Sequence, residues 1–242
     1  LNNRKNINLF VLHPHNKISK IQRKIMTTIG GSNVYNIAVE GSFDDCQKIV
    51  KELFNEDNFR SKINMSGVNS INWARIVCQI VYYFYSFLKL KTNNISFSVP
   101  TGNFGDIFAG YIAKKMGLPI DKLIVATNEN DILQRVINTG MYKPDKVKPS
   151  ITPSMDIQVA SNFERLLFYI VGENDQQVIS LVNDLRNKGS FSLNNSELDK
   201  IKEDLKDVKI NDDETQTSIK HRDKEHRYHI DTNTDNGIEE VG

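Results

Sequence analysis

The chain has 242 residues, of which 39% are hydrophobic and 25% charged, with 31 Lys and Arg against 30 Asp and Glu. That length and apolar share suffice for one large domain or two small ones. A net charge of +1 gives no reason to expect a nucleic-acid or membrane-surface binder. The sequence holds no apolar run of about eighteen residues, which excludes a transmembrane helix, and its start has no secretory h-region.

The first part of the chain predicts strands and helices in alternation. Strands are expected at 7–12 and 34–39, and helices at 20–27, where Ser19 is the N-cap, and from about 43 to Phe54. Strand–helix–strand–helix order is typical of a parallel α/β layer.

The second part continues this pattern. The helix expected over 71–90 is apolar around most of its circumference, which predicts that it is buried. The remaining expected elements are strands at 95–99 and 123–127, helices at 107–116, 162–171 and 176–188, a short helix from Asn130/Asp131 to Gly140, an ordered crossing loop at 143–155, and a charged surface helix from 196 to about 213.

The stretch Val-Pro-Thr-Gly-Asn-Phe-Gly-Asp at 99–106 lies between a predicted strand and a predicted helix. Its glycines let the backbone approach a ligand closely, and the N–H groups and dipole of the first helical turn favour an anion such as phosphate. The spacing matches neither the Walker A loop nor the dinucleotide fingerprint. A tight turn without a ligand is the alternative interpretation.

This stretch resembles the cofactor-phosphate loop of the threonine synthase family, in its fungal and enterobacterial-type branch. Further segments resemble the same family in the same order, including Asn-Ser-Ile-Asn-Trp-Ala-Arg-Ile at 69–76 and Ser-Asn-Phe-Glu-Arg-Leu-Leu at 161–167. The resemblance implies a three-layer α/β fold of the tryptophan-synthase-β-like kind (fold type II of pyridoxal phosphate enzymes), present incompletely. It also implies pyridoxal 5'-phosphate as cofactor and the conversion of O-phosphohomoserine and water to L-threonine and phosphate.

The resemblance assigns the cofactor phosphate to the loop residues Gly102, Asn103, Phe104, Gly105 and Asp106. The text at 230–237 is similar to a family segment whose threonine hydrogen-bonds the cofactor's pyridine nitrogen, which places that role on Thr234, with Asp235 beside the nitrogen. Arg75 is expected either to contact the substrate's phosphate or carboxylate, or to form a surface ion pair.

Two family segments are not found among the 242 residues: the one with the Schiff-base lysine and the Ser-Gly-Asp-Thr-Gly substrate-phosphate segment. We therefore expect a partial chain that is catalytically inactive by itself and contributes no catalytic residue. Two alternatives remain open: a phospholyase that releases a keto acid, and a non-catalytic remnant that binds pyridoxal phosphate or phosphate.

The expected domains are 1–62, the rest of a smaller α/β domain, 63–195, most of the cofactor-binding domain, and 196–242, a charged segment that returns to the cofactor site. No metal site is expected, because the histidines lack firm ligand spacing. Cys46, Cys78 and the aromatic run 82–85 are interpreted as packing residues. The expected partner is a small-molecule substrate, without nucleic acid or membrane, in the cytoplasm.

Overall fold

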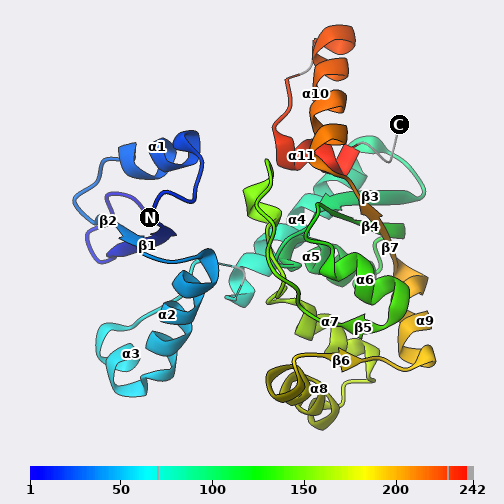
Figure 1. Cartoon of the computed structure of the whole chain (residues 1–242), viewed down its shortest axis with the longest axis horizontal. Coiled ribbons are helices and arrows are strands. Elements are labelled where there is room, and N and C mark those ends of the chain that lie inside the picture. Colours follow the sequence, from blue (N-terminus) through cyan, green and yellow to red (C-terminus); the bar gives the residue numbers. More distant parts are fainter. Residues whose placement is uncertain (70, 228, 239–242) are drawn as a thin grey trace. The chain divides into compact units, whose positions relative to one another are not determined.

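The chain divides into two compact units, Leu1–Ser66 and Gly67–Gly242. The structure is a computed structural model that describes residues 1–69, 71–227 and 229–238 (Figure 1). Ser70, which belongs to the 69–76 motif, and the last four residues of the expected C-terminal segment lie outside the described residues.

The first unit is built on a pair of parallel strands. Its elements are β1 (Leu9–Pro14), α1 (Lys20–Thr28), β2 (Val34–Val39), α2 (Phe43–Asn55) and α3 (Asp57–Ile63). Strands β1 and β2 pair in parallel, from Leu9 opposite Val34 to Pro14 opposite Val39. The predicted start of α1 is confirmed, because the Ser19 hydroxyl accepts a hydrogen bond from the Gln22 N–H at 3.1 Å.

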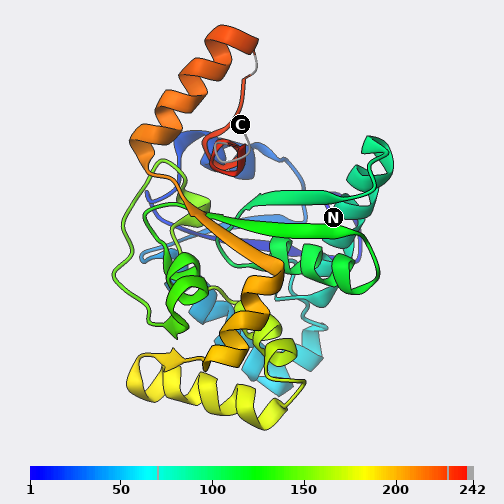
Figure 2. The ribbon, with the colours of Figure 1, turned by 90° about the vertical axis from the view of Figure 1, so that its right-hand side faces the viewer.

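The second unit contains a three-stranded parallel sheet in the order β3–β4–β7, seen with its strands side by side in Figure 2. The α/β fold class expected from the sequence is confirmed. Its elements are α4 (Trp73–Leu90), β3 (Ile95–Pro100), α5 (Gly105–Lys115), β4 (Ile120–Thr127), α6 (Ile132–Thr139), β5 (Met141–Tyr142), the 3₁₀ helix η1 (Pro153–Met155), α7 (Phe163–Ile170), α8 (Asp175–Lys188), β6 (Phe191–Ser192), α9 (Asn195–Asp204), β7 (Leu205–Lys209), α10 (Asp212–His226) and α11 (Thr232–Ile238).

The prediction of one surface helix over 196–213 is wrong, because β7 interrupts it. Leu205 pairs with Leu123 of β4 and Lys209 pairs with Thr127, so β7 is a parallel edge strand of the sheet. Leu205 and Val208 are buried, whereas the charged residues between them are not. The strand is five residues long and rich in charge, so its sequence has little strand character before the neighbouring strand is in place.

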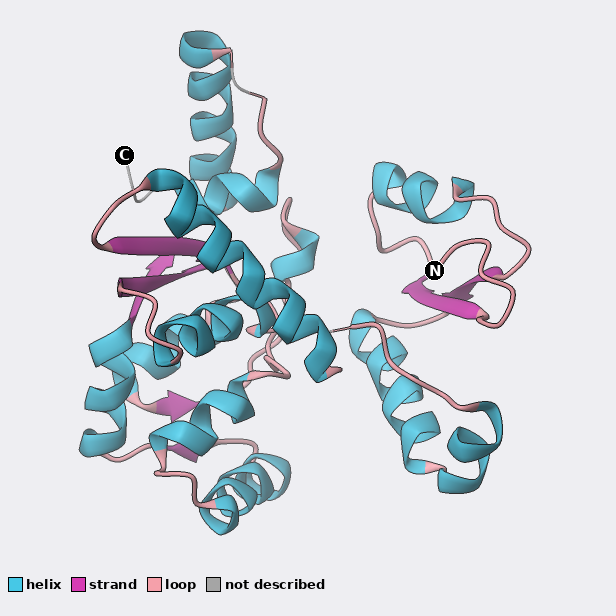
Figure 3. Cartoon of the chain, turned by 180° about the vertical axis from the view of Figure 1, so that it is seen from behind, coloured by secondary structure: helices cyan, strands magenta, loops and turns pink. Residues whose placement is uncertain are grey.

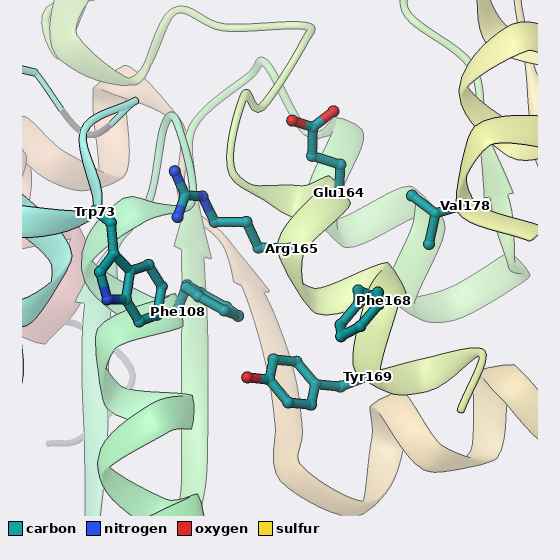
Figure 4. Close-up of a pocket in the computed structure, with 7 residues that line it drawn as sticks. All are labelled: Trp73, Phe108, Glu164, Arg165, Phe168, Tyr169 and Val178. Atoms are coloured by element: carbon teal, nitrogen blue, oxygen red, sulfur yellow. The ribbon is translucent and has the colours of Figure 1, made fainter. Parts of the chain in front are cut away.

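The expected burial of the long helix is also wrong for much of its surface. In α4, Ile76, Ile80 and Tyr83 are buried, but Val81 is 60% exposed and Leu88 70%. Tyr82, Tyr85 and Cys78 are exposed as well, so their interpretation as packing residues does not hold, whereas Cys46 is buried. One side of α4 packs on α5, and the described part of the second unit leaves the other side, visible in Figure 3, uncovered.

The crossing segment between β5 and α7 is ordered by a polar network. The Asp156 carboxylate accepts hydrogen bonds from the Ser150 backbone and hydroxyl and from the side chains of Asn128 and Asn130. Asp131 lies at the N-cap of α6 as expected, but its carboxylate pairs with Arg135 and makes no capping bond. None of the described helices has the length and apolar character needed to cross a membrane.

Candidate functional site

The candidate site is the connection from β3 to α5, at the edge of the sheet where the parallel strands end. The strand leaves the sheet at Thr101, whose N–H donates to the Ala126 carbonyl at 2.8 Å and whose hydroxyl donates to the Val99 carbonyl at 2.5 Å. The helix begins four residues later at Gly105. In open parallel sheets, ligands bind beyond such carboxyl ends, so this is the expected position for a binding loop.

Contacts with α7 hold the loop in place from its inner side. Phe104 is 1% exposed and packs edge-on against Phe163, with ring centroids 5.3 Å apart. The Asn103 carbonyl accepts hydrogen bonds from the backbone N–H of Asn162 at 3.1 Å and from its side-chain Nδ2 at 3.0 Å. Phe104 has a φ of 65°, so the chain reverses sharply here before it enters α5.

The backbone N–H groups of residues 102–107 make no hydrogen bond to any described residue. No side chain caps α5, because its N-cap residue is Phe104. Free N–H groups at a helix start, aligned with the helix dipole, form an anion-binding site. These residues line a cavity of about 270 Å³. The cavity is lined by Asn69, Arg75, Gln79, Pro100, Thr101, Gly102, Asn103, Phe104, Gly105, Asp106 and Ile107.

Two ionisable side chains of opposite charge face this cavity. Arg75, in the first turn of α4, supplies a positive charge, and Asp106, in the first turn of α5, supplies a carboxyl group. Burial raises the pKa of Asp106, while the Tyr83 hydroxyl and the Arg75 charge act in the opposite direction. The cavity thus combines amide donors and one guanidinium with a partly buried carboxylate.

The chain as a whole is similar to a known family. A profile described as "Pyridoxal-phosphate dependent enzyme" matches residues 3–184. The chain belongs to the pyridoxal-phosphate dependent enzyme family. The fold expected from the sequence, fold type II, is therefore correct. A likeness to serine racemase from Dictyostelium discoideum, at 12% identity with a TM-score of 0.55, supports the fold alone.

Threonine synthases are similar to the chain over most of its length. It is 48% identical over 216 residues to the threonine synthase of Pseudomonas aeruginosa, covering 88% of this chain and 46% of the relative. It is 45% identical to the threonine synthase of Saccharomyces cerevisiae, covering 91% of this chain and 46% of the relative. A crystal structure of pyridoxal-phosphate-bound threonine synthase from Brucella melitensis superposes with a TM-score of 0.89 at 44% identity, over 98% of this chain and 52% of that one. The chain spans about half the length of these relatives.

The residues of the cavity fit the phosphate group of the family's cofactor. A phosphate has several anionic oxygens that accept hydrogen bonds, and the free N–H groups of residues 102–107 are donors, with the positive charge of Arg75 in the same cavity. The loop approaches its neighbours closely, since a Cβ at Gly102 would lie 2.6 Å from the Ser154 carbonyl oxygen. The donors are therefore held in position before a ligand arrives.

Thr234 does not line this cavity. It is exposed, and its hydroxyl donates to Asp231 Oδ2 at 2.5 Å. Asp231 Oδ1 also accepts the N–H groups of Asn233 and Thr234, so that this aspartate caps α11. Burial would raise the pKa of Asp231, but these hydrogen bonds lower it, which keeps the carboxylate ionised as an acceptor. The α11 helix still lies near the loop, because Gly237 packs against Pro100.

Asp235 has a different environment from the one expected beside a pyridine nitrogen. It is 0% exposed, accepts a hydrogen bond from the Ser218 hydroxyl at 2.8 Å, and lies 3.4 Å from Arg222 Nε. The carboxylate therefore joins α11 to α10.

The other expected candidates do not form a second site. Among the residues that the structure describes, no group of three or more His, Cys, Asp and Glu is placed to hold a metal ion. His221 pairs with Glu225 and His229 with Asp223 on the surface. Asn69 and Gln79, by contrast, line the cavity without having been assigned from the sequence. The signal for Gln79 is its position four residues after Arg75, on the same face of α4.

Replacing Asp106 with asparagine is expected to stabilise the chain at neutral pH by roughly 1 kcal/mol, because it removes a charge whose burial is costly. The Tyr83 hydroxyl keeps its nearer acceptor, the backbone carbonyl of residue 106 at 2.9 Å. A carboxyl whose folded pKa is raised takes up its proton more readily in the folded state. The advantage of the variant should therefore fade as pH falls through this raised pKa. Urea unfolding of both proteins at neutral pH and at about pH 4 tests this; an advantage that grows on acidification would contradict it.

Proposed function

We propose that this chain forms the cofactor-phosphate part of a threonine synthase, the enzyme that converts O-phosphohomoserine and water to L-threonine and phosphate. The observation that carries the proposal is the row of free N–H groups at residues 102–107, facing a cavity that also receives Arg75. Identities of 40–48% with threonine synthases from bacteria and fungi support the choice within the family.

In this proposal the loop holds the phosphate of pyridoxal phosphate and thereby orients the rest of the cofactor. Gly102, Asn103, Phe104, Gly105 and Asp106 provide the backbone of the binding site, and the contact of Phe104 with Phe163 keeps it rigid. When bound, the cofactor supplies an electron-accepting ring. Arg75 lies beside the loop and is suited to the phosphate or carboxylate of the substrate.

Two further assignments are proposals of the same kind. Thr234 would reach the pyridine nitrogen after its hydroxyl leaves Asp231, from a helix that already packs on Pro100. None of the lysines in this chain is assigned to the covalent attachment of the cofactor. We therefore propose that the 242 residues by themselves do not catalyse the reaction.

The direct test of the loop is equilibrium binding of pyridoxal phosphate to the purified chain, followed by fluorescence. We expect inorganic phosphate to compete with it, and pyridoxal, which lacks the phosphate, to bind weaker by about tenfold or more. Equal affinity for pyridoxal and pyridoxal phosphate would contradict a phosphate role for this loop.

The test of the reaction is a chimera in which this chain replaces the matching half of the Saccharomyces cerevisiae threonine synthase. With O-phosphohomoserine it should release phosphate and L-threonine in equal amounts. A keto acid in place of threonine would favour the phospholyase. A folded chimera that binds pyridoxal phosphate but releases no phosphate would favour the non-catalytic alternative. The chain alone should release none; borohydride fixation of the cofactor on one of its lysines would contradict our assignment.

The remaining expectations concern the surroundings of the enzyme. The proposed partner is a small phosphorylated amino acid, and neither a nucleic acid nor a membrane is part of the proposal. The cytoplasmic location stays a prediction, which fractionation of the source cells would test.

A further inference from the structure

Helix α4 carries three polar side chains one turn apart on one side: Arg75, Gln79 and Tyr83. Tyr83 is 3% exposed and donates to the Asp106 carbonyl at 2.9 Å. Burial raises the pKa of Tyr83 well above its usual value, so its hydroxyl remains a donor. Arg75 lines the phosphate cavity at the other end of the row. Both neighbours of Gln79 on this face are thus directed at the start of α5.

Gln79 lines the same cavity, and its amide makes no hydrogen bond to any described residue. The carbonyl oxygen Oε1 is buried and has no partner, and Nε2 donates to no described acceptor. Buried side-chain amides are almost always hydrogen-bonded, because an unpaired one loses its contacts with water without replacement. If this side chain served packing alone, methionine at the same position would lower the free energy of folding, because it would leave no buried polar atom unpaired. We therefore expect the amide group of Gln79 to form its hydrogen bonds with a bound ligand.

The opposite wall of the cavity lacks partners in the same way. Residues 102–107 line the cavity, and their N–H groups have no acceptor among the described residues, the carbonyl oxygen of Gln79 included. A ligand with several oxygens in the cavity would accept hydrogen bonds from the N–H groups and from Nε2, whereas Oε1, itself an acceptor, can pair only with a donor such as a protonated phosphate oxygen. A phosphate has this form, and the –NH₂ of Gln79 can donate to one of its oxygens while the amides bind the others.

We propose that Gln79 is a ligand-binding residue of this site and donates a hydrogen bond from Nε2 to a phosphate oxygen. The inference rests on the proposed function of the loop and adds to it a contact from the helix opposite. It distinguishes Gln79 from Tyr83, which positions the loop through the Asp106 carbonyl and does not line the cavity.

The test replaces Gln79 with methionine, which has nearly the same length and no donor. Binding of pyridoxal phosphate and of inorganic phosphate should weaken by roughly fivefold or more, while binding of pyridoxal is unchanged. The thermal midpoint of the ligand-free chain should stay the same or rise, because an unpaired buried oxygen has been removed. The matched control is Gln134→Met on α6, a residue outside the cavity, which should change neither affinity.

A second variant, Gln79→Glu, decides the question if the methionine variant does not fold. It keeps the shape of the side chain but places a negative charge against the phosphate, so it should weaken phosphate binding more than methionine does. Unchanged affinity for both phosphorylated probes in either folded variant would overturn the proposal. A lower thermal midpoint with equal losses for pyridoxal and pyridoxal phosphate would make Gln79 structural. If the unsubstituted chain binds neither probe, the phosphate loop itself is refuted, and the role of Gln79 with it.

Discussion

Replacing Gly102 with valine is expected to weaken the binding of pyridoxal phosphate about a hundredfold or more. The new Cβ would lie 2.6 Å from the Ser154 carbonyl oxygen and 3.1 Å from Ile157 Cδ1. Ser154 belongs to η1, which lies in the segment held by the Asp156 network, so this backbone cannot easily move away. The loop must shift instead, and its N–H groups would no longer converge on one phosphate. Equilibrium binding with pyridoxal phosphate measures the effect.

The matched control is the same substitution at Gly30, where an added Cβ meets no atom within 4 Å and φ is not positive. Gly30→Val should leave the affinity unchanged. If Gly102→Val bound pyridoxal phosphate as well as the unsubstituted chain, the loop could not be the phosphate site. A fall in affinity without a fall in secondary-structure content, measured by circular dichroism, would locate the effect in the loop.

Replacing Gly110 with valine should lower the free energy of unfolding by about 3 kcal/mol. Gly110 lies in the middle of α5, and its Cβ would come within 2.5 Å of Tyr83 Cε1 and 2.8 Å of Leu123 Cδ2. Both side chains are buried, at 3% and 0% exposure, so neither can swing into solvent. At an exposed helical position the loss of a glycine would instead stabilise the protein. At Gly110 the substitution should destabilise the protein instead, because α4 lies too close to α5 to leave room for a larger side chain.

Urea unfolding measures this effect, with Gly110→Ala as an intermediate case and Gly30→Val as the control. The order of unfolding midpoints should be unsubstituted, then alanine, then valine. An alanine variant more stable than the unsubstituted chain would mean that α4 and α5 do not pack as closely as the contact between Gly110 and Tyr83 requires.

Local signals were sufficient for the elements that depend on neighbouring residues. Ser19 caps its helix because the acceptor and the donor are three residues apart, and such a contact forms wherever the helix begins. The strand before Thr101 and the helix after Gly105 were likewise readable from composition. The family resemblance then assigned the loop between them to a phosphate, which remains a prediction until binding is measured.

Contacts between distant segments account for the errors. Strand β7 forms because Leu205 pairs with Leu123, which lies more than eighty positions earlier in the chain. The five residues of β7 do not by themselves favour a strand. The exposed side of α4 carries the same kinds of residue as its buried side, so its periodicity could not tell which side α5 would cover. The sequence places Asp235 beside the cofactor, whereas in the folded chain it contacts Ser218 and Arg222 of α10, which lie 17 and 13 positions before it.

The order of residues along the chain was thus enough to predict the parallel α/β fold and the family, because both depend on spacings of a few residues or on long stretches of similar sequence. The assignment of the loop at 102–106 to an anion has the same local origin and stays a prediction. The residues that surround the loop could not be predicted in this way. Arg75 and Asn162 are 87 positions apart, and these two residues, with Gln79 and Ser154, surround the loop only after the sheet, α4 and α7 have packed. Residues that lie far apart in the sequence have no local pattern that predicts their proximity. Only the tertiary structure brings them to one site.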